Sequence, residues 1–270
     1  DQKALEDIGP FQNWGRDTMA MVIEALNESE DCHPAVIAVD VLYAGETDPE
    51  KDAWLAEAAG KYRNVVTACA AEFGSEFHIQ ENGKTFWNDF AVTAFDEPYP
   101  ELKTGTAQGH INAMLDADGI LRHSLWSVTT PDNTEVPSLA AVTAAKYLAY
   151  QSGTEEQTAD LDMVKRYLKE PPTDARGFWY LPFTGLPGDY SESISVSDIL
   201  SGAVPADYFA DRIVLIGPYA AGLQDSYPTA IDHAQPMYGV EYQANVIEAL
   251  LQENYKKEAA DSWQYLALFL

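Results

Sequence analysis

The segment 211–251 constrains the fold of this 270-residue chain more than any other stretch. It opens on RIVLIG at 212–217, a short run of mostly β-branched residues closed by Gly-Pro. Such a run predicts a strand buried on both faces of a sheet. A polar loop carrying Asp225 follows, and residues 239–251 then place apolar side chains at helical spacing. We therefore expect a buried strand, a loop with a carboxylate, and a helix that packs on the sheet.

Most other segments repeat this plan. We expect strands over the mainly apolar segments 35–42, 64–70, 107–114, 119–128 and 177–183. We expect helices at 48–60, 138–150, 158–169 and 195–202, and one that begins at Asp17 as its cap. An Asn-Gly pair inside an alternating pattern predicts a β-hairpin over 77–87, and residues 96–104 are predicted to be a proline-rich loop. The fold class that follows is α/β, with a mostly parallel mixed sheet, helices on both faces and a peripheral β-hairpin.

Two motifs in this segment carry a family resemblance. ADRIVLIGPYAAGLQD at 210–225 and YGVEYQANVIEALL at 238–251 resemble the C-terminal signature of CHASE sensor domains of the second type. Such domains are extracytoplasmic input domains of bacterial membrane receptors, most often controlling a class III adenylate or guanylate cyclase and sometimes a histidine or Ser/Thr kinase. The resemblance implies a sensor without enzymatic activity of its own. It also implies a homodimeric full receptor, because class III cyclases need paired catalytic domains.

A further match is the family pattern of Asn, then Asp-x-Asp-Gly, then Arg. It stands here at Asn112, Asp116, Asp118, Gly119 and Arg122. A calcium loop is the alternative interpretation of Asp-x-Asp-Gly, but the bidentate Glu that such a loop requires is missing at the later position. The pattern therefore favours a tight turn between two antiparallel strands.

The chain carries a net charge of −27 and a pI near 4.2. Nucleic acids require the opposite sign, so we expect no nucleic-acid partner. An anionic membrane surface would also repel most of the molecule. The charge fits an extracellular setting or simple solubility, and it does not identify a ligand.

The last residues, WQYLALFL at 263–270, place aromatic residues before an uninterrupted apolar run. This order is typical of the start of a membrane span, and the alternative is an ordinary amphipathic terminal helix. Together with the family resemblance, the pattern favours the membrane. We expect residues 1–260 to form one extracytoplasmic sensor domain and residues 261–270 to begin a truncated transmembrane segment that attaches it to the cell membrane.

Sequence motifs of catalysis are missing. The chain has no Walker loop, GxGxxG, GxSxG or HExxH, and its five histidines stand without ligand spacing. We expect no cofactor, no metal site and no catalytic residues. Two other hypotheses stay open: a secreted acidic hydrolase that uses Asp40 and Asp225, and a structural extracellular module without a pocket at the strand ends.

Polar residues follow the predicted strands at one edge of the sheet. In open parallel sheets, ligands bind beyond the carboxyl ends of the strands. Asp1, Asp40 and Asp225 are expected to leave from that edge. Arg16 points the same way, and Asn112 joins them if its strand runs in that sense. The candidate residues for binding an unknown small-molecule or environmental signal are Arg16, Asp40, His110, Asn112 and Asp225.

A structural role is the alternative for the same residues. Converging carboxylates repel one another unless a cation lies among them, so we expect Arg16 to pair with Asp40 or Asp225. The set would then be a buried polar network. His110 would be an ordinary half-buried strand histidine that makes hydrogen bonds.

The two cysteines are expected to be unpaired. Cys32 precedes one predicted strand and Cys69 ends the next, so parallel pairing places the thiols at opposite edges of the sheet. Strands of this length span ~17–20 Å, whereas a disulfide tolerates only ~7 Å between Cα atoms.

Overall fold

A computed structural model of the chain describes residues 1–29, 31–79, 83–154, 156, 159–174, 176–190, 194–256 and 261–269. Its α-helices are α1 (Gln2–Asp7), α2 (Arg16–Leu26), α3 (Pro49–Tyr62), α4 (Pro100–Gly105), α5 (Leu139–Gln151), α6 (Leu161–Tyr167), α7 (Val196–Leu200), α8 (Gly239–Leu251) and α9 (Asp261–Phe269). Its strands are β1 (Val36–Val39), β2 (Val65–Ile79), β3 (Thr85–Asp96), β4 (Ala107–His110), β5 (His123–Leu125), β6 (Ser127–Thr129), β7 (Glu135–Pro137), β8 (Phe178–Tyr180), β9 (Ile213–Ile216), β10 (Ser226–Tyr227) and β11 (Met237–Tyr238). Two short 3-10 helices are η1 (Phe11–Asn13) and η2 (Ala206–Phe209).

The central sheet contains four parallel strands in the order β9, β1, β2, β4. Ala38 in the middle of β1 lies opposite Val66 of β2 and Leu215 of β9. Beyond β1, the outer part of β2 pairs with the antiparallel β3. The predicted α/β fold with a mostly parallel mixed sheet is therefore confirmed.

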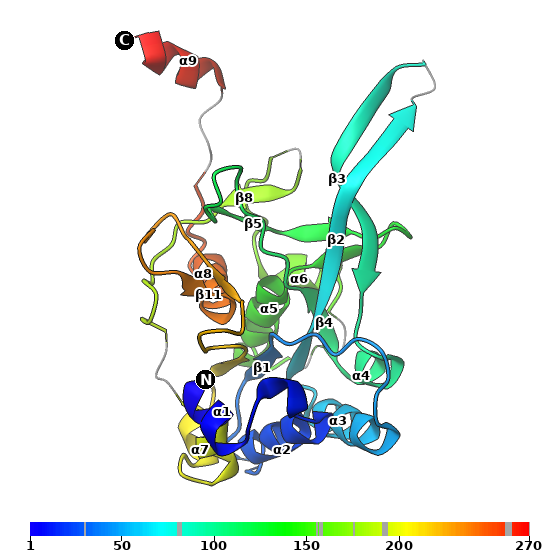
Figure 1. Ribbon diagram of the computed structural model, residues 1–270, viewed down its shortest axis with the longest axis vertical. Helices are drawn as coiled ribbons and strands as arrows, with labels where there is room; N and C mark the ends of the chain where they lie inside the picture. Colours follow the sequence, from blue (N-terminus) through cyan, green and yellow to red (C-terminus); the bar gives the residue numbers. More distant parts are fainter. Residues whose placement is uncertain are drawn as a thin grey trace.

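Helices cover both faces of this sheet, as Figure 1 shows. On one face α5 and α8 pack on it through buried side chains such as Leu139, Val142 and Val246. On the other face α2 and α3 bury residues such as Ile23 and Leu55. This two-sided burial explains why β1 and β9 are apolar at every position, since parallel sheets expose neither face to water.

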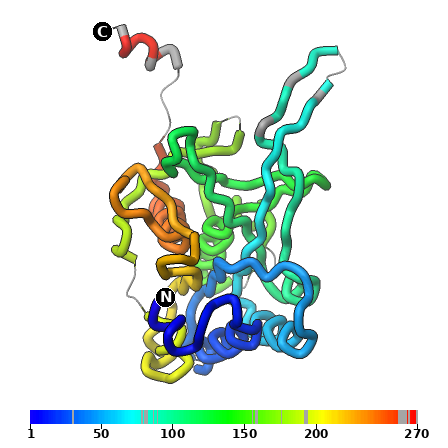
Figure 2. Tube along the Cα trace, in the orientation of Figure 1, coloured from blue at the N-terminus to red at the C-terminus, as the bar shows by residue number. Residues whose placement is uncertain are grey.

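The β-hairpin is longer than its sequence pattern indicated. β2 runs without interruption from the central sheet into the hairpin, and the β2–β3 ribbon projects from the body of the molecule (Figure 1, Figure 2). Register shifts between Glu72 and Phe73 and between Gly74 and Glu76 indicate bulges along it. The peripheral hairpin is confirmed; position 82 of its predicted Asn-Gly turn lies outside the described residues.

The predicted strands at 107–114 and 119–128 required the largest correction. β4 ends at His110 and pairs in parallel with β2, while the second segment divides into β5 and β6, which pair with β8 and β7. Beyond β4 the Asn112 side chain replaces the backbone as the partner of β2: it accepts from the Ala71 amide at 2.9 Å and donates to the Ala71 carbonyl at 2.7 Å. The Asp116–Gly119 turn exists, with Gly119 N donating to Asp116 O at 2.8 Å.

Three local predictions were also wrong. The loop at 96–104 contains α4, which begins at Pro100, where a helix has no need of the missing N–H. α2 begins at Arg16 after Gly15, so Asp17 lies in the first turn rather than at the cap. Gly60 does not end α3, because Arg63 in the left-handed conformation (φ 56°) does so. The two cysteines are free, as predicted.

Arg16 pairs with Asp52 of α3, so the prediction that it pairs with Asp40 or Asp225 was wrong. Its Nη1 lies 2.7 Å from Asp52 Oδ1, and both side chains are buried. Arg16 opens α2, which packs side by side with α3, so its guanidinium meets the first turn of α3 instead of reaching the strand ends. The position of Asp52 in a predicted helix gives no signal of this tertiary contact.

Neighbouring groups also contact both members of the Arg16–Asp52 pair. Arg16 donates to the Ala44 carbonyl at 3.2 Å, and its guanidinium lies 4.2 Å from the centre of the Tyr99 ring. Burial alone would raise the pKa of Asp52, but hydrogen bonds from the Thr47 amide (2.7 Å) and hydroxyl (3.0 Å), together with Arg16, hold that pKa below its ordinary value. The ionised pair therefore stabilises the contact between α2 and α3.

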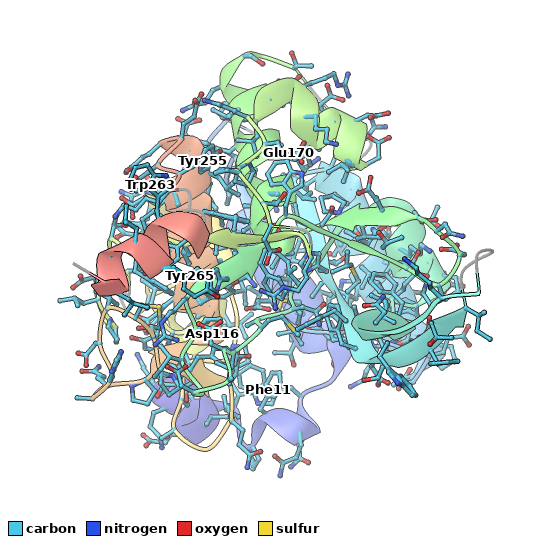
Figure 3. All side chains as sticks on the ribbon, turned by 90° about the horizontal axis from the view of Figure 1, so that it is seen from above. Phe11, Asp116, Glu170, Tyr255, Trp263 and Tyr265 are labelled. Atoms are coloured by element: carbon cyan, nitrogen blue, oxygen red, sulfur yellow. The ribbon has the colours of Figure 1, made fainter. Side chains whose placement is uncertain are left out.

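At the C-terminus, α9 is drawn apart from the body in Figure 1. Trp263 and Tyr265 lie on it with 67% and 64% of their surfaces exposed (Figure 3). Within the described parts of the chain, none of the helices combines the length and apolarity that crossing a membrane requires.

Replacing Arg16 with Ala should destabilise the protein by roughly 3–5 kcal/mol at neutral pH, because Asp52 is left buried and unpaired. The pKa of Asp52 is lower in the folded state, so the contribution of the pair is present at neutral pH and is lost as the pH falls through that folded value. Urea denaturation at pH 7 and in acid measures both effects. The matched control is Lys51→Ala, which breaks the exposed 2.9 Å pair with Asp17 and should cost at most ~1 kcal/mol. Equal losses in the two variants would contradict the role given to Arg16.

Removing residues 263–270 should leave the thermal midpoint nearly unchanged, because the exposed Trp263 and Tyr265 bury little apolar surface. Tyr255→Ala provides the contrast: its hydroxyl donates to Lys169 O at 2.8 Å and its ring packs edge-on against Trp179. Calorimetry should show a clear loss of stability for Tyr255→Ala alone. A comparable fall on truncation would show that α9 packs into the domain.

Candidate functional site

The candidate site lies where β1 and β9 end. These neighbouring strands run in parallel, and the Asp40 amide after β1 donates to Ile216 O of β9 at 2.7 Å. The chain then leaves them in opposite directions, since β1 leads to α3 on one face and β9 leads to α8 on the other. Such a switch in an open parallel sheet leaves a crevice at the carboxyl ends of the strands, which is where ligands bind.

A cavity of about 330 Å³ occupies this crevice. The loops after β1 and β9, the segment after β4, η1 and the N-terminal turns of α8 all contribute to its walls. Its apolar wall is formed by Phe11 (labelled in Figure 3), Val41, Leu42, Ile111, Ala113 and Pro218. The remaining wall is formed by Asp40, Asp225, Tyr227, Gly239, Tyr242 and Gln243. Two of the five predicted site residues, Asp40 and Asp225, are therefore brought together in one cavity.

Asp40 is 7% exposed, although it is a carboxylate. No described residue donates a hydrogen bond to its side chain. Burial, with a smaller contribution from the charge of Asp225, raises the pKa of Asp40 to about 7. Asp40 therefore changes its charge near neutral pH.

Asp225 lies at the N-terminal end of α8, where the helix dipole favours a negative charge. The Gly239 amide donates to the Asp225 carbonyl at 3.1 Å, and the Asp225 carboxylate rests against the Cα of Gly239. A Cβ at position 239 would lie 2.4 Å from Asp225 Oδ1, so a larger residue here would displace the Asp225 carboxylate. Burial raises the pKa of Asp225, while a hydrogen bond from Tyr227 acts in the opposite direction.

Gly217 allows α8 to approach the end of β9. A Cβ at this position would lie 3.0 Å from Val240 Cβ and 3.2 Å from Asp40 Cβ. The close approach holds Asp40 beside the first turn of α8. Gly217 and Gly239 thus set the distance between the two loops that carry the carboxylates.

Two tyrosines supply neutral polar groups to the cavity. Tyr242 on α8 is 2% exposed, and its hydroxyl donates to His123 O at 3.4 Å. Burial raises the pKa of Tyr242 to about 12 and also raises that of Tyr227. Both tyrosine hydroxyl groups therefore stay protonated at physiological pH. The cavity presents acidic acceptors and apolar surface, and no three metal-binding side chains converge within the described residues.

The other predicted residues have structural positions. His110 is 1% exposed on β4 and does not line the cavity, because strand side chains alternate and the neighbouring Ile111 does. Neither ring nitrogen of His110 has a hydrogen-bond partner in the described structure, and burial lowers its pKa to about 3. Asn112 uses its amide on Ala71, and Asp1 caps α1 through the Ala4 amide at 2.8 Å.

A second cavity of about 700 Å³ runs along the free edge of β9. Its walls are mainly apolar side chains of β9, α7 and α8, including Ile199, Leu215 and Ile247. Of its polar groups, Glu248 already accepts a 2.8 Å hydrogen bond from the Thr184 hydroxyl. The smaller cavity is the better candidate, because it combines the strand-end position with a buried carboxylate that has no donor.

Sequence reasoning missed Tyr227, Tyr242 and Gly239. One signal could have found them: Gly239 stands at the first position of the predicted helix, and the aromatic Tyr242 follows three positions later. The first turn of a helix more often carries a capping or acidic residue. This signal indicates that the N-terminal turn of the helix approaches another part of the chain closely.

Asp40→Asn should stabilise the protein above neutral pH. The pKa of Asp40 rises from 3.8 to about 7 on folding, so the folded state binds more protons in that range and its stability falls as the pH rises through it. The neutral Asn avoids this loss, which is on the order of 4 kcal/mol at ~1.36 kcal/mol per pKa unit. Urea denaturation should show a clear advantage for Asp40→Asn at pH 8 and little difference at pH 4. A variant that is less stable at both pH values would contradict a buried carboxylate without donors.

Comparison with known proteins identifies the family of the chain. A sequence model of the CHASE2 domain matches residues 1–270, which is the whole chain. Neither the curated proteins nor the solved structures gave a match. The chain therefore belongs to the CHASE2 family, the second type of CHASE domain, whose members are extracytoplasmic sensory domains of receptors.

Proposed function

We propose that this chain is the signal-binding domain of a bacterial transmembrane receptor, and that the cavity at Asp40 and Asp225 holds the signal. One observation carries this proposal: Asp40 is buried against a cavity and no described residue donates a hydrogen bond to its carboxylate. A buried carboxylate without a partner reduces stability. Groups of this kind concentrate at binding and catalytic sites, where a ligand supplies the missing partner.

The position of α8 supports a route for the signal. Its first turn forms one wall of the cavity, and thirteen residues at 1.5 Å each make it about 20 Å long. Its C-terminal end continues into residues 252–256, where Tyr255 is fixed to Lys169 O. A ligand that moves the first turn of α8 would shift this far end and the segment that follows it. We infer that residues 261–270 begin the membrane attachment.

We propose a class III adenylate or guanylate cyclase as the output of the receptor, in a homodimer that pairs two catalytic domains. Family membership supports this output, and a histidine or Ser/Thr kinase is the alternative effector for the same domain. A chimera that joins this chain to a cyclase of known output, tested beside one with a kinase, separates the two. Hydrolysis by Asp40 and Asp225 receives no support from a family of sensory domains.

The test of the cavity is a thermal-shift screen of small metabolites against the wild type and Ala113→Trp. Ala113 lines the cavity, so the indole should fill it and abolish binding. A ligand at ~100-fold its Kd contributes about 2.7 kcal/mol, which raises the Tm of a domain of this size by roughly 5–10 °C. Ala203→Trp, at an exposed position away from the cavity, is the control and should keep the full shift. Binders that stabilise Ala113→Trp as much as the wild type would place the signal site elsewhere.

A further inference from the structure

Within the described residues, no lysine, arginine or histidine lines the cavity that holds the Asp40 and Asp225 carboxylates. Arginines and lysines total 16 in the chain against 43 acidic residues, so cations are scarce. Arg16, which was expected to reach the strand ends, forms an ion pair with Asp52 instead. Arg122 is held by Asp116 and Asp118, each at 2.7 Å.

Two independent features of the geometry indicate an occupant. The first is a partly open cavity of about 330 Å³, at the lower end of the volumes that small ligands occupy. The second is the Asp40 side chain, more than nine-tenths buried, which lines this space and accepts no hydrogen bond from the described residues. Asp225 lines the same space from the opposite loop.

We propose that the cavity binds a small organic cation, with its ammonium group between the Asp40 and Asp225 carboxylates and its carbon chain against Val41, Ile111 and Pro218. This ligand class rests on the proposed function and specifies its signal. An ammonium offers three donors and a full positive charge to groups that only accept. Tyr227 and Tyr242 also line the cavity, and aromatic rings attract cations.

Other ligand classes fit less well. An anion would enter a space that already holds two acidic groups and no cation. A neutral alcohol would satisfy acceptors but leave the negative charge uncompensated. A divalent metal ion needs more converging oxygen ligands than the described residues provide.

A proton competes with this cation. The titratable groups that face Asp40 are Asp225 from the β9–α8 loop, Tyr227 from β10 and Tyr242 from α8. Both tyrosines remain protonated, so the two carboxylates determine the charge of the cavity. With a pKa of about 7, Asp40 is mostly protonated at pH 6 and mostly ionised at pH 8. Affinity for an ammonium should therefore rise about tenfold between these two pH values.

The test is isothermal titration calorimetry of the whole chain with n-butylammonium, n-butanol and butyrate in an amine-free phosphate buffer. Only n-butylammonium should bind saturably, about tenfold more tightly at pH 8 than at pH 6. Asp225→Asn should weaken binding at least tenfold. Asp40→Asn should also weaken it at pH 8 and should remove the pH dependence, and its improved stability at pH 8 excludes misfolding as the cause.

Asp174→Asn is the matched control, because Asp174 is an acidic residue of a surface turn that pairs with Arg176 at 2.9 Å. Asp174→Asn should bind n-butylammonium as the wild type does. If the ammonium is only attracted to the overall negative charge, binding should weaken equally in Asp40→Asn, Asp225→Asn and Asp174→Asn, and that result would overturn the proposal. Butanol or butyrate binding as tightly as the ammonium, with Ala113→Trp abolishing it, would overturn the cation class and leave the signal cavity standing. Saturable ammonium binding that Ala113→Trp does not affect would overturn both. No ammonium binding at either pH, in a folded wild type, would overturn the cation class.

Discussion

The parallel pairing of β9, β1 and β2 is the constraint on which the rest of the structure depends. Parallel strands cannot be joined by tight turns, so each connection must cross a face of the sheet, here with helices on both sides. Because β1 and β9 send their helices to opposite faces, a crevice opens between their carboxyl ends. Gly217 and Gly239 let α8 approach this crevice closely enough to form its wall. The position of the cavity is thus a consequence of the topology.

Charge is the second organising factor. The chain has few cations, and the buried guanidinium of Arg16 lies between α2 and α3, where it pairs with Asp52. The same fold buries Asp40 beside a cavity whose described lining contains no lysine, arginine or histidine, and this burial raises the pKa of Asp40, so the folded state becomes less stable as the pH rises. Asp52 therefore stabilises the fold through its ion pair, whereas an ionised Asp40 destabilises it, and we propose that a ligand compensates this charge.

Much of the fold could be predicted from local patterns, and the failures share a cause. The apolar run at 213–216 and the helical spacing at 239–251 correspond to β9 and α8, because burial on both faces leaves a direct trace in composition. The segment at 119–128 has equally strand-like residues, yet it pairs with β7 and β8 outside the central sheet. Which strand a segment pairs with depends on partners far away in the chain, so alternation alone could not decide it.

For the site, the sequence alone determined that Asp40 and Asp225 follow buried strands and so leave the sheet at one edge. It also determined the acidic charge and the family signature. Only the tertiary structure decided that these two carboxylates share a cavity with Tyr242, while Arg16 is held by Asp52. The reason is that strand ends are fixed by local burial patterns, whereas the reach of a long side chain depends on which helices pack together. The pairing of charges is therefore a property of the packed molecule, because it appears only when α2 and α3 lie against each other.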